Sequence, residues 1–341
     1  MHLNTFSVSS HRTTQSVSMK KVLRTLFCII SAGLFIQTQA QDLKNILNNL
    51  EVKMVAPGII STNGFEYGTT VSPDGKLLFF TKGISGFKRN TILFSEKKNG
   101  KWQTPQIAPF SGEWNDVNPY FSKDGKTFYF VSNRPTQDVN LKRRNWWYVR
   151  KKGSKWGIPK VVKGKVNGAH DMIYPSITSQ GNAYFCTYNI PGGKGSLDIY
   201  ESKLVNGKYQ KPKALTALNT KYSDADPEMS PDGKFFAFTS TRRGGLGHYD
   251  LYICKVDKEG NIGKPIHLGS KINSSMMDSD PIFSPDGRKL YFSSSRITPR
   301  KKHPKKFVSY QALNQYLQSE ENGLMNIYVV DISKLIDYLN Q

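Results

Sequence analysis

The chain has 341 residues, of which 38% are hydrophobic and 12% aromatic, and its formal net charge at pH 7 is +22. This hydrophobic content is sufficient for a core of stacked sheets, and the large positive charge favours acidic partners. The three cysteines lack zinc-site spacing, which excludes a zinc-binding domain.

The first feature along the chain is a predicted secretory signal. Basic residues at 20, 21 and 24 form a positive head at the start of an apolar run over 22–36, and Thr38-Gln39-Ala40 ends it with small residues at the −3 and −1 positions. The run is shorter than the about 20 apolar residues of a transmembrane helix, so no transmembrane segment is expected in the mature chain. We predict initiation at Met19, cleavage after Ala40 and a periplasmic or secreted protein. Removal of this leader lowers the positive charge by four.

A turn followed by a strand recurs along the chain. In Ser284-Pro285-Asp286-Gly287, proline fixes φ at the first inner position and glycine accepts the positive φ that closes the turn; the apolar run Leu290–Phe292 then predicts a strand. The glycines of the five copies are Gly75, Gly125, Gly181, Gly233 and Gly287. A strand-based period of about fifty residues indicates a propeller or another repeat array.

Each repeat continues beyond this hairpin. Asp250-Leu251-Tyr252-Ile253 predicts a third strand, and a glycine, an aromatic residue and a proline precede a short fourth strand, as in Gly207-Lys208-Tyr209 with Pro212. Four short strands per repeat are typical of one propeller blade.

These phrases together carry a family resemblance. An acid three residues before proline, Ser-Pro-Asp-Gly-Lys, Tyr-Phe-x-Ser-x-Arg and Asp-Ile-Tyr resemble the TolB-like, WD-type β-propeller repeat of bacterial envelope proteins, over about residues 52–332. The resemblance implies an all-β propeller fold. It implies no single function, because propellers serve both as binding scaffolds and as enzymes.

The register of the copies predicts how the ring closes. Residues 52–56 read as a fourth strand without a repeat of its own, whereas the last repeat, which ends at 326–332, lacks a fourth strand. We therefore predict one propeller of five four-stranded blades, closed by the N-terminal strand, with a sixth blade possible only if a degenerate copy was missed. The predicted segments are a leader (1–40), a short N-terminal segment (41–51), the propeller (52–332) and a tail (333–341).

One acidic residue recurs at the same place before the proline of the first strand. The set is Glu66, Asp116, Asp224 and Asp278, with Asp171 displaced by one residue in the third copy. Because first strands line a propeller channel, these carboxylates could face one another, hydrolyse a glycosidic bond or hold a cation. The favoured alternative is a structural tether that accepts loop N–H groups, since a residue present in every repeat usually serves the repeat. No metal site is predicted.

The third copy adds a histidine beside its displaced acid. His170 with Asp171 could form a proton acceptor with its orienting partner, or contact a ligand at the channel mouth. The alternative is a solvent-exposed histidine without catalytic function, and no nucleophile can be placed beside it by sequence.

Two loops carry basic residues next to apolar or aromatic ones. In the second blade the run at 142–147 includes Arg143, Arg144, Trp146 and Trp147, and in the fifth an insertion at 297–325 includes Arg300, Lys301, Lys302, His303, Lys305 and Lys306. Tryptophan beside arginine is typical of a binding hot spot, and the insertion resembles a docking arm for an acidic surface. A solvated or disordered loop is the alternative.

The remaining repeated residues are predicted to be structural. Arg134, Arg242 and Arg296 lie nine residues after a turn glycine and should hold the loop to the next strand, with Asp250 as the partner of Arg242. Cys186 and Cys254 are expected to be buried packing residues.

Two function classes follow. The first is an exported, non-enzymatic propeller that binds an envelope protein or an acidic polysaccharide through loops on one face, with no nucleic acid partner and no cofactor. The alternative is a polysaccharide-processing hydrolase or lyase that acts on an acidic glycan through Asp171, His170 and the repeated acids.

Overall fold

The computed structural model describes residues 21, 25, 37–137, 144–153, 155–167, 170–188, 190–297 and 306–341. The chain divides into two compact units, Met1–Ile46 and Leu47–Gln341. Within the first unit, the described residues from 37 onward are helical. All strands lie in the second unit, and none of the described helices is long and apolar enough to cross a membrane.

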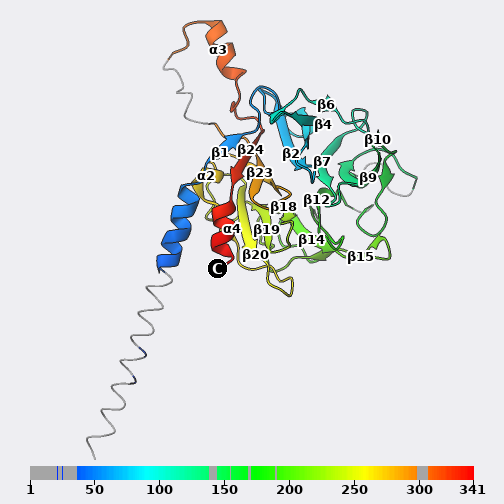
Figure 1. Ribbon diagram of the computed structural model, residues 1–341, viewed down its shortest axis with the longest axis vertical. Coiled ribbons are helices and arrows are strands. Elements are labelled where there is room, and N and C mark those ends of the chain that lie inside the picture. The colour runs from blue at the N-terminus through cyan, green and yellow to red at the C-terminus, as the bar shows by residue number, and fades with distance from the viewer. Residues whose placement is uncertain are drawn as a thin grey trace, which may run out of the picture. The chain divides into compact units, whose positions relative to one another are not determined.

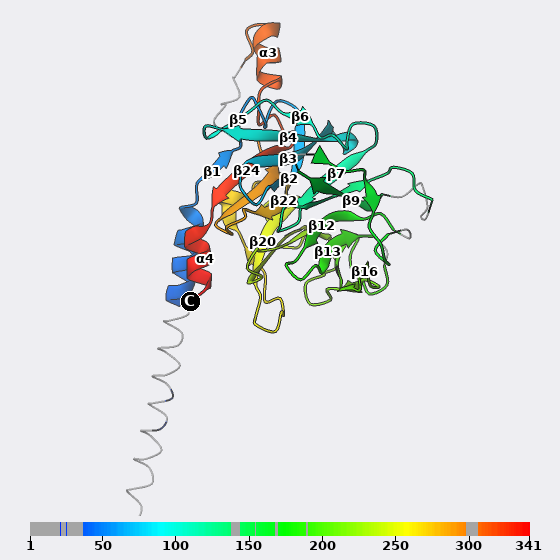
Figure 2. The same cartoon turned by 45° about the vertical axis from the view of Figure 1, so that its right-hand side comes forward.

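The second unit is an all-β propeller of five antiparallel blades, as predicted, with the innermost strands β2, β7, β12, β18 and β22 gathered around the centre (Figures 1 and 2). Blade one contains β2 (Phe65–Val71), β3 (Leu77–Ile84), β4 (Lys88–Lys98), β5 (Lys101–Trp102) and β6 (Gln106–Ile107). Blade two contains β7 (Asp116–Phe121), β8 (Thr127–Ser132), β9 (Asn145–Lys152), β10 (Lys155–Trp156) and β11 (Lys160–Val161). Blade three contains β12 (Ile173–Ile177), β13 (Ala183–Thr187), β14 (Asp198–Ser202) and β17 (Lys213–Ala214), with β15 (Leu204–Val205) and β16 (Lys208–Tyr209) as an outer hairpin.

Blade four contains β18 (Asp224–Met229), β19 (Phe235–Ser240), β20 (Asp250–Lys255) and β21 (Ile266–His267). Blade five contains β22 (Asp278–Phe283), β23 (Lys289–Ser294), β24 (Asn326–Asp331) and β1 (Val52–Met54). Three short helices accompany the strands: α2 (Gly269–Ile272), α3 (Tyr310–Leu317) and α4 (Ser333–Leu339).

The N-terminal strand closes the ring, as the repeat register predicted. β1 pairs antiparallel with β24, with Lys53 opposite Val329, and the two strands run side by side in both views (Figures 1 and 2). The N–H of Val55 extends the pairing by donating to the carbonyl of Ile327 at 2.8 Å. The last blade therefore has its fourth strand from the opposite end of the propeller sequence.

This closure gives a first testable prediction. Val55→Pro removes the N–H that bonds to Ile327, and proline cannot replace it. Val55→Ala keeps that N–H and removes only side-chain packing, so it is the matched control. We expect the proline variant to be less stable than the alanine variant by about 2 kcal/mol, measured by urea unfolding. Equal stability of the two variants would show that the Val55 bond does not contribute to closure.

Aromatic contacts between neighbouring sheets form much of the core. Phe79 of blade one meets Phe121 of blade two edge-on, with ring centroids 5.4 Å apart. Trp146 meets Phe185 at 5.3 Å across blades two and three, and Tyr184 meets Phe236 at 5.1 Å across blades three and four. Each blade is thus covered on both faces, which explains the high aromatic content.

The serine, the aspartate and the glycine of the repeated turn each have a structural role. In blade one the Ser72 hydroxyl donates to Asp74 at 2.6 Å and accepts the N–H of Leu77 at 2.9 Å, and Gly75 has a φ of 69°. The same serine–aspartate contact occurs at residues 122 and 124, 230 and 232, and 284 and 286. We call the end of the propeller that carries these turns the turn side.

Candidate functional site

A bulge interrupts each innermost strand at the centre of the ring. In all five blades the pairing register shifts there, and one residue adopts a left-handed backbone conformation: Gly68, Asn118, Tyr174, Asp226 and Asp280, with φ between 49° and 56°. Such a bulge breaks the strict alternation of side chains along a strand. The residue at the bulge is therefore placed differently from what a two-residue period predicts.

Side chains from these bulges meet across the centre. The Tyr174 hydroxyl of blade three donates to the carbonyl of Pro281 in blade five at 2.7 Å. The N–H of Asp280 in blade five bonds to the Asp226 carboxylate of blade four at 3.4 Å, and Thr239 donates to the same oxygen at 2.9 Å. Polar contacts thus join blades three, four and five across the channel.

Two carboxyl groups are paired in this channel. Burial raises the pKa of Asp226, and the nearby charge of Asp280 raises it further. Burial likewise raises the pKa of Asp280, although hydrogen bonds from Ser293 and Ser279 oppose that effect. Two close acids in a buried site do not both ionise readily, so the pair retains a proton above the usual range of an aspartate.

A third buried carboxyl group, Glu228 of β18, lies on the turn side of this pair. Its side chain belongs to a residue only 4% exposed, and its Oε2 has no hydrogen-bond partner within the described part of the chain. Burial raises the pKa of Glu228 to about 8. At neutral pH this carboxyl group is therefore mostly protonated.

Glu228 lines a pocket of about 660 Å³ on the turn side. Side chains from all five blades and α4 contribute to its wall, including Thr70, Tyr120, Thr178, Ile282 and Asn340. Lys123, Lys234 and Arg288 lie at its rim with Asp232 and Asp286. The pocket thus combines a buried acid, hydroxyl groups and basic residues in one concave site.

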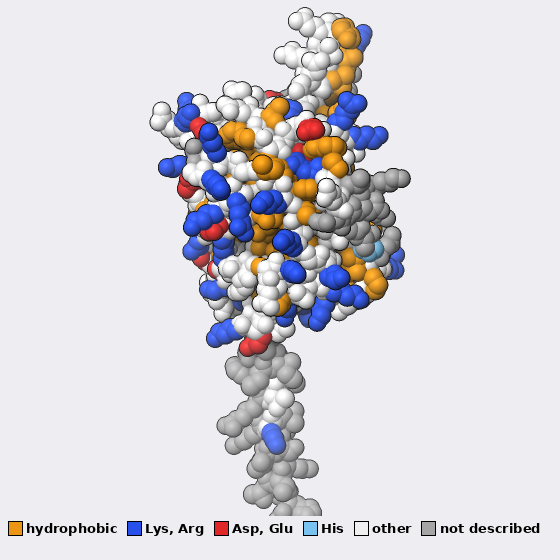
Figure 3. Space-filling model, turned by 90° about the vertical axis from the view of Figure 1, so that its right-hand side faces the viewer, with side chains coloured by type: hydrophobic (Ala, Val, Ile, Leu, Met, Phe, Trp, Pro, Cys, Tyr) orange, Lys and Arg blue, Asp and Glu red, His pale blue; other side chains and the backbone are white. Residues whose placement is uncertain are grey.

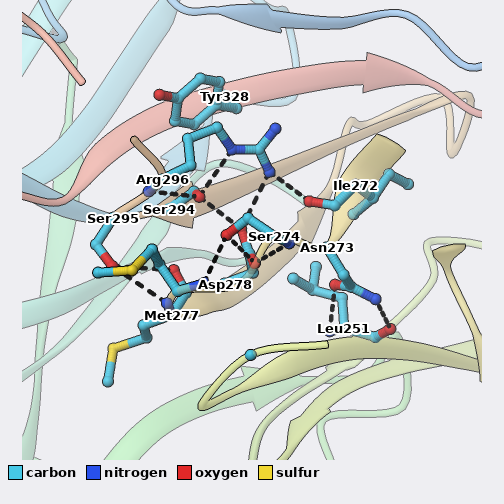
Figure 4. A network of polar contacts seen from close by, with 12 residues as sticks. Leu251, Ile272, Asn273, Ser274, Met277, Asp278, Ser294, Ser295, Arg296 and Tyr328 are labelled. Atoms are coloured by element: carbon cyan, nitrogen blue, oxygen red, sulfur yellow. Dashed lines mark hydrogen bonds and ion pairs between the residues drawn. The ribbon is translucent and has the colours of Figure 1, made fainter. Parts of the chain in front are cut away.

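The four repeated acids do not face one another around the channel. Glu66, Asp116, Asp224 and Asp278 are fully buried, and each is bound within its blade or to the adjoining strand. Asp278 accepts the N–H and hydroxyl of Ser274 at 2.6 and 2.8 Å, and Arg296 donates to it at 3.0 Å (Figure 4). These contacts join the loop before β22 to the end of β23, which is a tether.

The same ion pair recurs in two other blades. Arg134 donates to Asp116 at 2.8 Å, and Arg242 donates to Asp224 at 2.6 Å. The prediction that Arg242 pairs with Asp250 is therefore wrong. Oδ2 of Asp250 accepts the N–H of Leu246 at 2.7 Å instead. In blade one Lys82 replaces the arginine and binds Glu66 at 2.7 Å.

The described hydrogen bonds of Asp171 connect the loop before β12 to the start of β9 and to β13. The Asp171 carboxylate accepts the backbone N–H of Arg144 at 2.7 Å, and the Asp171 carbonyl accepts the Thr187 hydroxyl at 2.6 Å. His170 is half-buried in the loop before β12. Within the described residues, no group of three His, Cys, Asp or Glu side chains is arranged to hold a metal ion.

The prediction that Trp146 and Trp147 form an exposed binding hot spot is wrong. Trp146 and Trp147 lie in β9, where they are 0% and 6% exposed, and they pack in the core between blades. Arg144 is half-buried, and Lys306 is exposed beside α3. The other residues predicted for these loops lie outside the described residues: Arg143, Arg300, Lys301, Lys302, His303 and Lys305.

The cysteines behave as packing residues. Cys186 and Cys254 are fully buried and not disulfide-bonded. Burial raises the pKa of both thiols, so neither is a reactive thiolate at neutral pH.

Comparison with known proteins identifies no family for this chain. No protein-family model and no curated protein matches the chain. Among solved structures, a protein described as TolB from Agrobacterium tumefaciens is 19% identical, over 68% of this chain and 70% of that one, with a TM-score of 0.42. The α-L-arabinofuranosidase PaAbf62A from Podospora anserina is 11% identical, over 82% and 96%, with a TM-score of 0.46.

A third similar structure is larger than this chain. It is a puromycin-hydrolyzing peptidase from Mycobacterium tuberculosis, 12% identical over 67% of this chain but only 34% of its own length, with a TM-score of 0.38. At identities and TM-scores this low, these structures support no conclusion about the function of this chain.

Proposed function

We propose that the protein is an exported, non-enzymatic propeller that binds an acidic polysaccharide on its turn side. The observation that carries this proposal is the charge of the outer hairpins on that side. In blades one to three these hairpins carry exposed basic residues: Lys97, Lys98, Lys101, Lys151, Lys152, Lys155, Lys203 and Lys208. We call this set the basic surface.

Hydrogen bonds place the basic surface next to the repeated turns. The N–H of Lys97 donates to the carbonyl of Lys76 at 2.8 Å, and that of Lys151 donates to Lys126 at 2.8 Å. In blade three the Tyr209 hydroxyl donates to the turn glycine Gly181 at 3.0 Å. The basic surface and the central pocket therefore lie at the same end of the blades.

Few acids offset these lysines. On the side of the molecule in Figure 3, Lys and Arg side chains clearly outnumber Asp and Glu. The acids beside these lysines are Glu96, which pairs with Lys98 at 2.9 Å, and the turn aspartates Asp74 and Asp124, whose carboxylates accept hydrogen bonds from serine and keep their negative charge. A polyanion with regularly spaced charges could contact several hairpins at once, which favours an acidic polysaccharide over a single small anion.

The test is retention by an acidic polymer. The full chain should bind polygalacturonate at 150 mM salt and not neutral dextran, and the binding should weaken as salt screens the charges. Replacing Lys152, Lys155 and Lys208 by serine should weaken it about tenfold, because each exposed ion pair contributes about 0.5 kcal/mol. Replacing Lys255, Lys258 and Lys264 of blade four, where Asp257 and Glu259 lie nearby, is the matched control.

Two results of this test would overturn the proposal. One is equal retention by dextran, and the other is an equal effect of the two triple variants. The hydrolase hypothesis is the second candidate, favoured by a protonated Glu228 in the same pocket as ionised Asp286, whose pKa is lowered by a hydrogen bond from Ser284. The same incubation distinguishes it, because cleavage would produce new reducing ends.

A further inference from the structure

Two buried polar atoms of residues that line the turn-side pocket have no hydrogen-bond partner within the described part of the chain. These are Oε2 of Glu228 and Oγ1 of Thr178, both among the residues that line the pocket. Buried polar groups are nearly always hydrogen-bonded in folded proteins, because an unpaired one costs about 1–3 kcal/mol. Two such atoms at one cavity would suit a ligand with hydroxyl groups.

We propose that this pocket holds the terminal sugar of an acidic polysaccharide, with Glu228 and Thr178 bonded to its hydroxyls and its carboxylate among Lys123, Lys234 and Arg288. The inference rests on the proposed function and specifies its central subsite. The volume of about 660 Å³ is in the range of small-molecule sites and would accommodate a chain end.

The protonation of the Glu228 carboxyl group would allow it to bond to a sugar hydroxyl. Ser176 and the backbone of Phe283 already contact its carboxyl group, and burial raises its pKa to about 8. The protonated group therefore offers both a donor and an acceptor to a ligand. Groups of this kind recognise vicinal hydroxyls, each of which also donates and accepts.

Basic residues at the rim supply the charge selectivity. Lys123 of the β7–β8 turn donates to the carbonyl of Pro231 in the β18–β19 turn, which places its ammonium group between two blades at the pocket. Lys234 and Arg288 follow the turn glycines of blades four and five and are exposed. Arg288 is further oriented by Asp337 of α4, with 2.5 Å between Nη1 and Oδ1. A carboxylate at the rim would be attracted by these three cations, which outnumber Asp232 and Asp286 there, whereas a neutral sugar would gain no ion pair.

The experiment measures the affinity of trigalacturonate for the full chain by calorimetry. Glu228→Gln keeps a donor and an acceptor and should bind within threefold of the unmodified protein. Glu228→Met keeps the volume but removes both, and it should weaken binding at least tenfold. Asp280→Asn, which changes a buried carboxyl group of the channel outside the pocket lining, is the matched control and should bind normally.

The outcomes separate this inference from the proposed function. If the polymer binds through the basic surface but Glu228→Met binds trigalacturonate normally, the pocket assignment is overturned and the proposed function stands. If trigalactose binds as tightly as trigalacturonate, the role of the three rim cations is overturned. If neither polymer nor trisaccharide binds, the proposed function itself fails. A selective loss in Glu228→Met, with Glu228→Gln retained, establishes the subsite.

Discussion

Replacing Asp278 by leucine while Arg296 remains is expected to lower the free energy of unfolding by about 3–5 kcal/mol. The side chain of Asp278 is fully buried and that of Arg296 is 11% exposed, so the guanidinium would lose its carboxylate partner in a site that water hardly reaches. Ser274 and Ser294 would lose their acceptor as well. Urea unfolding of the two proteins measures the difference.

Two further variants identify the cause. In the double variant Asp278→Leu with Arg296→Met no unpaired charge remains, so part of the lost stability should return. Asp337→Leu breaks a pair of the same residue types, Arg288 with Asp337, but both side chains are about half exposed, at 46% and 60%. That variant should cost less than about 1 kcal/mol. A loss as large as that of Asp278→Leu would mean that burial does not decide the contribution of these pairs.

The fold was predictable because its signals are local and repeated. The turn sequence Ser-Pro-Asp-Gly specifies its own conformation through proline, glycine and the serine–aspartate bond, and it occurs at a regular period. Because the strand at 52–56 has no repeat of its own and the last repeat lacks a fourth strand, only one way of closing the ring remained. β1 and β24 close it in that way.

The channel residues were not predictable by counting along the strand. In Asp224-Ala225-Asp226-Pro227 we weighed a channel position for the first aspartate and favoured a tether. The first aspartate is bound by Arg242, and the bulge brings the second one into the channel. The residue just before proline is disfavoured in the right-handed helical region, but sequence alone does not reveal a left-handed bulge. The signal that could have found Asp226 and Asp280 is their shared place before that proline, next to the repeated acid.

The tryptophans were misassigned for a different reason. Tryptophan beside arginine is typical of a binding hot spot, so we placed the run at 142–147 in an exposed loop. Each blade is instead covered by a neighbouring blade on either face, and consecutive residues of β9 are both buried. Strands covered on both faces read as continuous apolar runs, which is how this sequence should be read.

Stability should fall as pH rises from about 5 to about 8.5, because three channel carboxyl groups must ionise in buried positions. The pKa values of Asp226, Glu228 and Asp280 are raised in the folded state, Glu228 to about 8. A carboxyl group with a raised folded pKa contributes stability that is complete below its unfolded pKa, near 4, and lost as pH passes the folded value. The expected loss is on the order of a few kcal/mol.

Other groups act in the opposite direction and must be separated. The turn aspartates Asp74, Asp124 and Asp286 have lowered pKa values, because the turn serine donates to each carboxylate, so their contribution is lost only below about pH 4. Burial lowers the pKa of His267, which adds stability as pH rises through the range near 6.5. The measurement is therefore the difference between the unmodified chain and the triple variant Asp226→Asn, Glu228→Gln, Asp280→Asn.

As pH rises, the triple variant should become increasingly more stable than the unmodified chain, because its three amides cannot ionise. All other titratable groups are the same in the two proteins. Urea unfolding at pH 5, 7 and 8.5 gives the comparison, with Glu51→Gln and Glu259→Gln, both exposed, as controls that should not change the slope. Parallel stability curves for the two proteins would mean that the channel acids ionise at ordinary pH. They would then carry negative charge at neutral pH, and Glu228 could no longer donate to a sugar hydroxyl.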